Sequence, residues 1–496
     1  MNVTASHLTM RMQGARRALL AMPLLVAALA GCTQVPDAQR QVSLPIPRTI
    51  DRDEAAPATV RENARILASY GGVYDNPRLQ AEIEKTVARL VAASERPDLK
   101  YQVTMLNSPA INAFALPNGH LYISRGLIAL AADRAELASV LAHEMGHVIA
   151  RHAAIREEQA RQTALISQVV SEVLSDPNVG ALALAKSRLT LASFSRAQEF
   201  EADGIGVGIS SRAGFDSFGA AGFLTAMQRN ADLKNGRSKD EGGDPHVADF
   251  MSSHPATPER VKNALANARQ FSGPGNGERD RDQYLADIDG MVYGEDPSEG
   301  FARGRRFVHP KLGFTFVAPA NFTLDNTSQA VLGLKDGGDE AMRLDVVSVP
   351  AEQRLSEYLK SGWIDNVDPT SAEDFTINGF AAATAASKGE RWSFRLFAVR
   401  YGSDVYRFIF AARNLTAEND RAFRESVGTF RRMSLKESAG VKPLHIRVVT
   451  VKAGDTIDKL ASRMATDHKL NRFLLLNGFS ANDTLKPGEK VKIVME

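Results

Sequence analysis

The stretch LASVLAHEMGHVIARH, Leu137 to His152, contains two histidines four residues apart, with a glutamate directly after the first. On a helix, residues at this spacing share one face, so the imidazoles of His143 and His147 can both reach one metal ion. Glu144 lies about 100° round the same helix and can touch a water molecule on that metal. The H-E-x-x-H pattern therefore predicts two metal ligands, His143 and His147, and a general base, Glu144.

The residues around the motif decide between a metal site and an ordinary helix. A helix with a solvated histidine pair is the alternative, but the flanking letters ASVLA and MGHVIA make this helix largely apolar, and histidines inside such a helix need polar partners. A metzincin site would continue with Gly at position 150 and a ligand His at position 153, where this chain has Ala150 and Ala153. His152 misses that register by one residue, so we expect it to be structural.

A second segment, SRAQEFEAD from Ser195 to Asp203, offers a carboxylate as the third ligand. Glu199 and Asp203 share a helix face, whereas Glu201 is turned roughly 200° away from Glu199 and is not expected to serve the same site. Glu199 would complete a His/His/Glu set with the fourth position left for water. Asp203 would accept a hydrogen bond from the free nitrogen of a ligand histidine. A solvated acidic face is the alternative for both residues.

Length and composition describe an ordinary globular protein of several domains. The 496 residues are too many for one domain, so about two to four domains are expected. A formal net charge of +2 does not point to nucleic acid as a partner. Cys32 is the only cysteine, which excludes an internal disulfide and a zinc site held by cysteines.

The N-terminus has the pattern of a secretion signal. Three arginines precede the apolar run ALLAMPLLVAALAG, which is too short to span a bilayer comfortably, so residues 1–31 are expected to be a cleaved signal peptide. The letters LAGC resemble the bacterial lipobox, which implies a lipid on Cys32 and, with Thr33 after it, the outer membrane. A plain signal peptide with an incidental cysteine is the alternative. Residues 32–60 carry prolines among polar residues and predict a tether.

The rest of the chain divides by its patterns. Residues 61–271 have mostly helical periodicity, with alternating stretches between 101 and 130 that predict a small β-sheet. A run rich in glycine and charge predicts a linker over 272–299. Residues 300–436 predict an α+β domain of antiparallel strands and a few helices, without a visible catalytic constellation.

Four motifs together resemble a known family: NAFALPNGHLYISRGLI, ELASVLAHEMGH, SRAQEFEAD and SSHPATPER. The stretch from about 60 to 270 is similar to the HtpX-like and CAAX-prenyl-endopeptidase family of zinc metallopeptidases, in its periplasmic BepA-like branch. This resemblance implies a mainly α, zincin-type (gluzincin) catalytic domain with one Zn²⁺ per chain. In the family pattern E-x-x-A-D, the first glutamate is the third zinc ligand, which corresponds to Glu199.

The same resemblance implies roles for further residues. The strand that carries Asn112, Ala113 and Phe114 is expected to pair with an extended substrate, since backbone hydrogen bonds can hold a peptide of any sequence. His254 and Arg260 are implied to stabilise the oxyanion of the tetrahedral intermediate. In some periplasmic members this histidine instead occupies the fourth zinc position and holds the enzyme inactive. A surface histidine in a helix-capping turn is the alternative for His254.

Residues 447–495 show the order strand, helix, helix, strand and resemble the LysM module. LysM modules bind glycans that contain N-acetylglucosamine, such as peptidoglycan. The landmarks of the module are Gly454, Asp455 and Thr456, which open the first helix, and Asn477, which ends the second. The resemblance implies that these residues bind glycan; the alternative is that they preserve only the fold.

These observations favour a zinc-dependent endopeptidase of the bacterial periplasm. We expect it to be anchored to the outer membrane by lipid, to bind peptidoglycan through the LysM-like module, and to act on misfolded envelope proteins in quality control. A non-proteolytic chaperone or peptidoglycan-bound scaffold, which would use the cleft to hold clients, is the alternative from another class. A latent enzyme gated by His254 is a third possibility.

Overall fold

The computed structural model describes residues 58–158, 161, 194–237, 254–255, 257–389 and 391–496. The expected signal peptide, the lipobox cysteine Cys32 and nearly all of the expected tether lie outside these residues. Within the described residues, no helix is both long and apolar enough to cross a membrane. The first helix, α1, is Ala58–Ser69.

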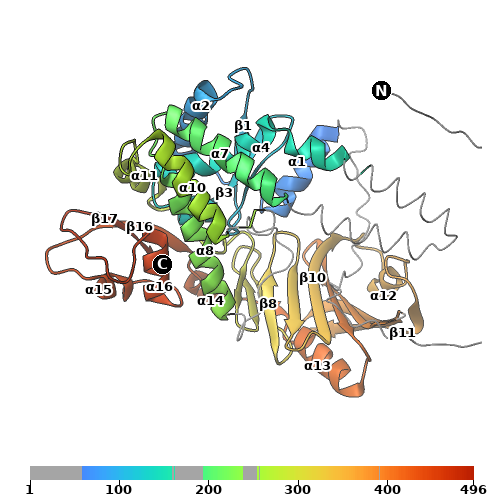
Figure 1. The fold of residues 1–496 in the computed structure, drawn as a ribbon. Helices are drawn as coiled ribbons and strands as arrows, with labels where there is room; N and C mark the ends of the chain where they lie inside the picture. The colour runs from blue at the N-terminus through green and yellow to red at the C-terminus, as the bar shows by residue number, and fades with distance from the viewer. Residues whose placement is uncertain (1–57, 159–160, 162–193, 238–253, 256, 390) are drawn as a thin grey trace, which may run out of the picture. The chain divides into compact units, whose positions relative to one another are not determined.

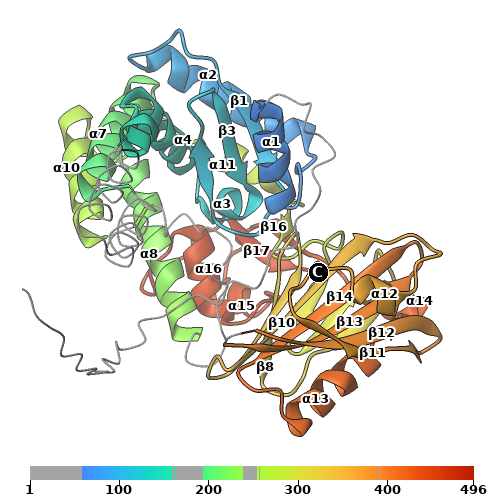
Figure 2. The same ribbon diagram turned by 90° about the vertical axis from the view of Figure 1, so that its right-hand side faces the viewer.

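A three-stranded sheet and a set of helices form the N-terminal part (Figures 1 and 2). The sheet has the order β1-β3-β2; β3 runs parallel to β1 and antiparallel to β2. Because β2 pairs with β3 alone among the described strands, its other edge is available to a further strand. The strands are β1 (Gln102–Leu106), β2 (Ala113–Ala115) and β3 (His120–Ser124). The helices are α2 (Pro77–Ala93), α3 (Arg125–Leu130), α4 (Arg134–Ile149), α7 (Arg196–Arg212), α8 (Gly219–Arg237) and α10 (Pro258–Phe271).

Helix α4, which carries the H-E-x-x-H motif, is the buried centre of this part. Its N-cap is Asp133, whose side chain accepts a hydrogen bond from the backbone N–H of Glu136. Fourteen of its sixteen residues are buried, in keeping with a helix that is apolar on all sides. The motif is therefore held inside the protein, where its polar groups need partners.

Small residues let α7 pack very close to α4. A Cβ atom on Gly206 of α7 would lie 2.9 Å from the backbone nitrogen of His143, and one on Gly146 of α4 would lie 3.0 Å from the carbonyl oxygen of Ala202. Real Cβ atoms essentially never come so close to backbone atoms, so only glycine fits at Gly206 without a shift of the helices. This close packing brings the EFEAD segment of α7 against the HEMGH segment of α4.

The middle part of the chain folds around two antiparallel sheets. The larger has the strand order β11-β12-β13-β14-β10-β9-β8 and the smaller β15-β7-β6-β5. Phenylalanines are frequent in one core cluster of this part, to which α13 (Ala417–Gly428) contributes, whereas a second cluster, to which α12 (Leu355–Leu359) contributes, consists of aliphatic residues and alanine. The strands are β5 (Phe301–Arg303), β6 (Arg306–His309), β7 (Phe314–Val317), β8 (Phe322–Asn326), β9 (Val331–Lys335), β10 (Glu340–Ser348), β11 (Val367–Ile377), β12 (Phe380–Lys388), β13 (Ser393–Tyr401), β14 (Asp404–Ala412) and β15 (Arg431–Arg432).

The C-terminal part has the order β16 (Leu444–Thr450), α15 (Ile457–Ala461), α16 (Lys469–Asn477) and β17 (Lys490–Met495). It follows the short helix α14 (Leu435–Gly440). The strands β16 and β17 pair in antiparallel fashion. The chain as a whole is therefore multidomain, with mixed helix and sheet content.

The segment expected to be a linker, 272–299, is instead largely part of the fold. It forms helix α11 (Arg281–Ile288) and strand β4 (Val292–Tyr293), and β4 pairs with β16. The physical reason is the short apolar pattern inside it: Tyr284, Leu285 and Ile288 are at most 1% exposed and belong to the core. The glycine and charged letters that suggested a linker lie mainly before this helix.

Candidate metal centre

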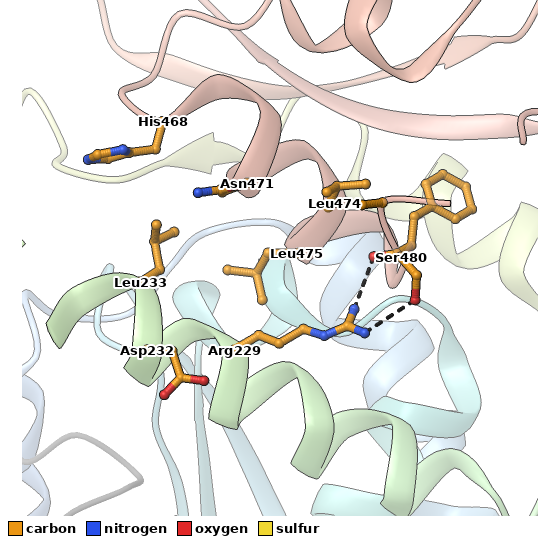
Figure 3. Close-up of a pocket in the computed structure, with 10 residues that line it drawn as sticks. Arg229, Asp232, Leu233, His468, Asn471, Leu474, Leu475 and Ser480 are labelled. Carbon is orange, nitrogen blue, oxygen red and sulfur yellow. Dashed lines mark hydrogen bonds between the residues drawn. The ribbon is translucent and has the colours of Figure 1, made fainter. Parts of the chain in front are cut away.

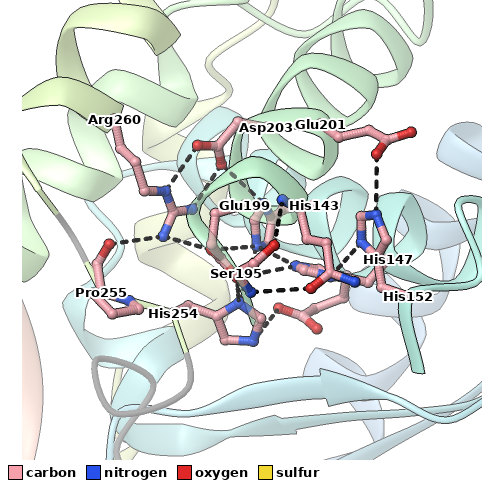
Figure 4. Close-up of polar contacts among 12 residues, drawn as sticks. His143, His147, His152, Ser195, Glu199, Glu201, Asp203, His254, Pro255 and Arg260 are labelled. Carbon is pink, nitrogen blue, oxygen red and sulfur yellow. Dashed lines mark hydrogen bonds and ion pairs between the residues drawn. The ribbon is translucent and has the colours of Figure 1, made fainter. Parts of the chain in front are cut away.

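Four buried side chains converge on one point (Figure 4). His143 and His147 come from α4, Glu199 from the first turn of α7, and His254 from the segment that precedes α10. One donor atom of each lies within 4.8 Å of the others. Ser195 begins α7 with a capping box shared with Gln198, which places Glu199 at the helix N-terminus, where the helix dipole favours a carboxylate.

The donor atoms lie close enough together to surround one metal ion. Nε2 of His143 lies 3.1 Å from Nε2 of His147 and 3.3 Å from Nδ1 of His254. Oε1 of Glu199 lies 3.5 Å from Nε2 of His147 and 2.8 Å from Nδ1 of His254, and its other oxygen, Oε2, lies 3.6 Å from Nε2 of His143. A tetrahedral zinc site with metal–ligand distances of roughly 2 Å has edges of about 3.3 Å. The donor set of three imidazoles and one carboxylate therefore fits a zinc ion.

Two parts of the chain, one of which contains this site, match known protein-family profiles. Residues 77–268 match the profile of peptidase family M48, and residues 449–494 match that of the LysM domain. This chain carries an M48 peptidase domain. The recognition made from the four sequence motifs is thereby confirmed, as is the LysM domain at the C-terminus. Peptidases of family M48 are metal-dependent, in agreement with the donor set described above.

Three relatives show how far the similarity extends. A putative beta-barrel assembly-enhancing protease of Vibrio cholerae is 32% identical over 42% of this chain and 43% of its own length. The beta-barrel assembly-enhancing protease of Escherichia coli is 27% identical over 45% of each chain. The mitochondrial metalloendopeptidase OMA1 of Schizosaccharomyces pombe is 31% identical over 36% of this chain and 50% of its own. The chain thus spans half or less of the length of these relatives.

Behind His143, the M48 domain holds a buried ion-pair network. Nδ1 of His143 lies 2.9 Å from Oδ1 of Asp203. Arg260 donates to both Asp203 oxygens, at 2.8 Å and 2.7 Å, and its third nitrogen lies 2.8 Å from Glu199. Burial alone would raise the pKa of Asp203, but the hydrogen bonds from Arg260 and His143 outweigh it and hold that pKa below its usual range. Asp203 is therefore an anion that can orient His143 as a ligand.

This network assigns Arg260 a different position from the one implied by the family resemblance. Its guanidinium contacts Asp203, Glu199 and the carbonyl oxygen of Pro255, to which it donates at 3.1 Å, and its side chain is only 3% exposed. Each of its three nitrogens thus has a partner within the protein in this structure. The physical reason is that Asp203 and Glu199 are two buried carboxylates that need a cation.

Glu144 lies beside the donor set with one oxygen unused. Among the described residues, Oε1 of Glu144 is buried and has no hydrogen-bond partner, while Nε2 of His254 lies 3.8 Å away. Burial, followed by the charge of Glu199, raises the pKa of Glu144 well above its usual value. Its surroundings in this structure therefore disfavour the ionised form of the Glu144 carboxyl group.

Strand β2, which is expected to pair with substrate, lies beside Glu144. Ala113 and Phe114 belong to β2, whose next residue, Ala115, donates a backbone hydrogen bond to Glu144. Asn112 is buried just before the strand and donates to the hydroxyl of Tyr70 at 2.7 Å, so it holds the strand and does not face solvent. The edge of β2 is thus placed next to the base.

Sequence reasoning assigned His152 only a structural role and turned Glu201 away from the site. The structure brings both to the rear of His147: Nδ1 of His152 is 2.9 Å from Nδ1 of His147, and Nε2 of His152 is 3.3 Å from Glu201. The cause is Arg151, which adopts a left-handed conformation with φ 56° just after α4 and redirects the chain. No glycine or asparagine marks this turn, so the sequence carried no signal for it.

The four residues expected to bind glycan do not form one surface. Gly454, with φ 80°, Asp455 and Thr456 lie together in the turn that opens α15, where Thr456 is the N-cap. Asn477 is only 3% exposed; it donates to the carbonyl oxygen of Lys492 at 2.9 Å and accepts from its N–H at 2.7 Å. Both ends of its amide are therefore used to join α16 to β17, which corrects the expected contact with glycan at Asn477.

A pocket of about 540 Å³ lies between α8 and the LysM domain (Figure 3). Arg229 of α8 crosses it and donates to the carbonyl oxygen of Phe479 at 3.0 Å and to the hydroxyl of Ser480 at 3.4 Å. His468 and Asn471 of the LysM domain line its other wall. Any molecule held there would contact both domains.

Proposed function

We propose that this protein is a zinc-dependent endopeptidase. The proposal rests on one observation: a buried carboxylate oxygen of Glu144, which makes no hydrogen bond to the described residues, lies beside four donor atoms that could hold one metal ion. Zinc, when bound, would lower the pKa of a water molecule and polarise the scissile carbonyl. His143, His147 and Glu199 would hold the ion, and Asp203 and Arg260 would keep these ligands in place.

In this proposal Glu144 is the residue that moves protons. The ionised carboxylate of Glu144, which the charge of a bound zinc ion would favour, takes the proton of the attacking water and then delivers it to the leaving amine. The open edge of β2 holds the substrate backbone in an extended form, which aligns the scissile bond with Glu144. Since this contact involves only backbone groups, the enzyme would accept many sequences.

His254 supplies the fourth donor atom of this set, and this position suggests how activity could be regulated. Catalytic zinc sites keep one position open for water or substrate. With Nδ1 of His254 2.8 Å from Glu199 and 3.3 Å from Nε2 of His143, that position is taken by the protein itself. We therefore propose that this arrangement is latent and that His254 must move away before cleavage, after which it can assist at the oxyanion.

The cellular setting is also part of the proposal. The LAGC letters at Cys32 and the LysM domain support a lipid-anchored protein of the periplasm that binds peptidoglycan and acts at the outer membrane. Relatives of the chain are named beta-barrel assembly-enhancing protease, and we propose misfolded envelope proteins as the substrates, in quality control of the envelope. Labelling of cells with a radioactive fatty acid tests the anchor: label is expected on wild type and not on Cys32→Ser.

The activity is tested with purified full-length protein. We expect about one zinc per chain by elemental analysis, cleavage of casein, and loss of cleavage on treatment with a chelator. The alternative, a chaperone or peptidoglycan-bound scaffold, predicts suppression of client aggregation without cleavage and without any effect of the chelator. Protein that binds no metal would contradict the endopeptidase.

A further inference from the structure

A second buried histidine stands directly behind the proposed zinc ligand His147 (Figure 4). Nδ1 of His152 is 2.9 Å from Nδ1 of His147, and His152 is only 1% exposed. The other ring nitrogen of His152, Nε2, is 3.3 Å from an oxygen of Glu201, whose side chain is 60% exposed. A line of contacts thus runs from the metal centre through two imidazoles to a carboxylate at the surface.

The direction of each hydrogen bond in this line follows from the metal site. When Nε2 of His147 binds a metal through its lone pair, the single proton of the neutral ring must be on Nδ1. That N–H donates to Nδ1 of His152, which must therefore be the unprotonated nitrogen of His152. The proton of His152 is then on Nε2, from which it is donated to Glu201. Only this one arrangement of protons lets His147, His152 and Glu201 form both hydrogen bonds while His147 binds a metal.

The local fold holds His152 in this place from two sides. The left-handed turn at Arg151 brings the residue back under His147, and Glu201 reaches it from α7. The ring of Phe194 covers the face of His147 with a centroid distance of 4.0 Å. Arg156, four residues after His152, in turn lies 4.1 Å above the Phe194 ring. The His147 ring is therefore fixed by an edge contact and a face contact at once.

The two ligand histidines of α4 are supported in different ways. His143 donates toward Asp203, a buried anion that accepts hydrogen bonds from Nε and Nη2 of Arg260. On its Nδ1 side, His147 instead faces the imidazole of His152, and a carboxylate, that of Glu201, comes only after this ring. A ligand histidine usually donates its second N–H to a carboxylate, a carbonyl or water, which fixes its tautomer and orientation. For His147 this function must be carried by His152.

We propose that His152 and Glu201 are positioning residues for the metal centre: they fix the tautomer and the ring orientation of His147, and so set the affinity for zinc. This inference rests on the proposed function, in which His147 is a zinc ligand. It goes beyond that function because neither residue touches the ion or the substrate.

The test measures metal binding and not only activity. Full-length wild type, His152→Phe, His152→Asn and Glu201→Ala are titrated with Zn²⁺ against a chromophoric chelator, and with Co²⁺ while the visible ligand-field bands are recorded. His152→Phe keeps a ring but removes the acceptor, so its zinc affinity should fall by about 10- to 100-fold and its Co²⁺ bands should shift. His152→Asn keeps an acceptor near Nδ1 and should recover most of the affinity.

Glu201→Ala provides the test at the surface, where misfolding is not a concern. Its matched control is Glu259→Ala, because Glu259 is also an exposed acid (61% against 60%) and pairs with Arg196 at 3.0 Å. Glu201→Ala should weaken zinc binding several-fold while the control matches wild type. Equal affinities in Glu201→Ala, His152→Phe and wild type would overturn the inference alone, whereas wild type that binds no zinc would overturn the proposed function with it.

Discussion

Nε2 of His254 lies 3.8 Å from Oε1 of Glu144, so the group that fills the fourth ligand position also faces the proposed general base. The other ring nitrogen of His254 is 2.8 Å from Glu199. One imidazole thus stands between a ligand and the base, in the space where a water molecule and a substrate carbonyl would have to enter. Release of His254 would free both the fourth position and the oxygen of Glu144 in one movement.

Replacement of His254 by alanine should raise peptidase activity. The variant opens the fourth position, so casein cleavage is expected to increase while zinc affinity falls because one donor is lost. Cleavage rate and zinc content are measured on the same preparation. A lower rate with full zinc content would instead support a role for His254 at the oxyanion only.

Glu144→Gln should bind zinc and fail to cleave. The amide keeps the size of the side chain but cannot accept the proton of the attacking water, which is expected to reduce cleavage by a factor of about 10² to 10⁴. Elemental analysis and a casein assay check both parts. Normal cleavage by this variant would contradict the mechanism.

Arg260→Lys should weaken the metal centre although the charge is kept. Lysine cannot donate to both oxygens of Asp203 and also reach Glu199, so two buried carboxylates lose a partner. Loss of one partner of a buried ion pair typically costs about 3–5 kcal/mol of unfolding free energy. Thermal unfolding with and without zinc measures this; Arg196→Lys, at an exposed pair, is the control. Unchanged stability and unchanged zinc affinity would contradict the bracing role.

Lys492→Met should destabilise the junction between the LysM and M48 domains. The buried ammonium of Lys492 donates to the carbonyl oxygens of Ala129 and Ala131 at 2.8 Å and 2.7 Å, and burial lowers its pKa to about 7. Removing the donor leaves two buried carbonyls unpaired, at a cost of about 1–3 kcal/mol each. Lys490→Met on the same strand, where only a 3.6 Å ion pair is lost, should be nearly neutral in thermal unfolding. Equal melting temperatures in the two variants would refute this.

His309 should make the middle part of the chain sensitive to acid. Burial, assisted by the charge of Lys311, lowers the pKa of His309 from 6.5 to about 4, so the unfolded chain binds a proton that the folded chain does not. Stability is therefore lost as the pH falls from about 6.5 to about 4, by up to roughly 3 kcal/mol. His309→Asn, which keeps an acceptor for the N–H of Leu312, should flatten this dependence.

Tryptophan fluorescence can follow that transition selectively. Trp363 and Trp392 are the two tryptophans of the chain, and both lie in the middle part. Urea unfolding at several pH values, for wild type and His309→Asn, therefore reports the region that contains His309. Parallel curves for the two proteins would refute the assignment.

Helical geometry explains why much of the metal centre can be predicted. The spacing of His143, Glu144 and His147, and that of Glu199 and Asp203, depends only on the pitch of a helix, so the sequence alone indicates which of these side chains share a face. Arg260 is harder to place, because its partners are on another helix and only packing shows that it faces the ligands from behind. The position of His152 depends on a left-handed Arg151, a conformation that most residue types rarely adopt.

Two other expectations, the linker over 272–299 and the glycan contact of Asn477, are wrong because the same sequence pattern is compatible with two different structures. The glycine and charged residues at the start of 272–299 suggest a linker, yet the side chains of Tyr284 and Ile288, a few residues later, are buried in the core. Asn477 matches a landmark of a glycan-binding module, but its amide is used to fasten α16 to β17. In both cases the decisive quantity is burial against segments distant in sequence, which a local pattern does not contain.

The close contact of α7 with α4 has a consequence for engineering and for natural variation. Gly206 has no functional group, and yet even a methyl group there would press on the backbone of His143 and push the two helices apart. Glu199 would move with its helix, and a shift of a few tenths of an ångström alters a coordination shell. The geometry of the proposed metal site therefore depends on a residue that has only a hydrogen atom as its side chain, and a survey limited to reactive side chains would overlook it.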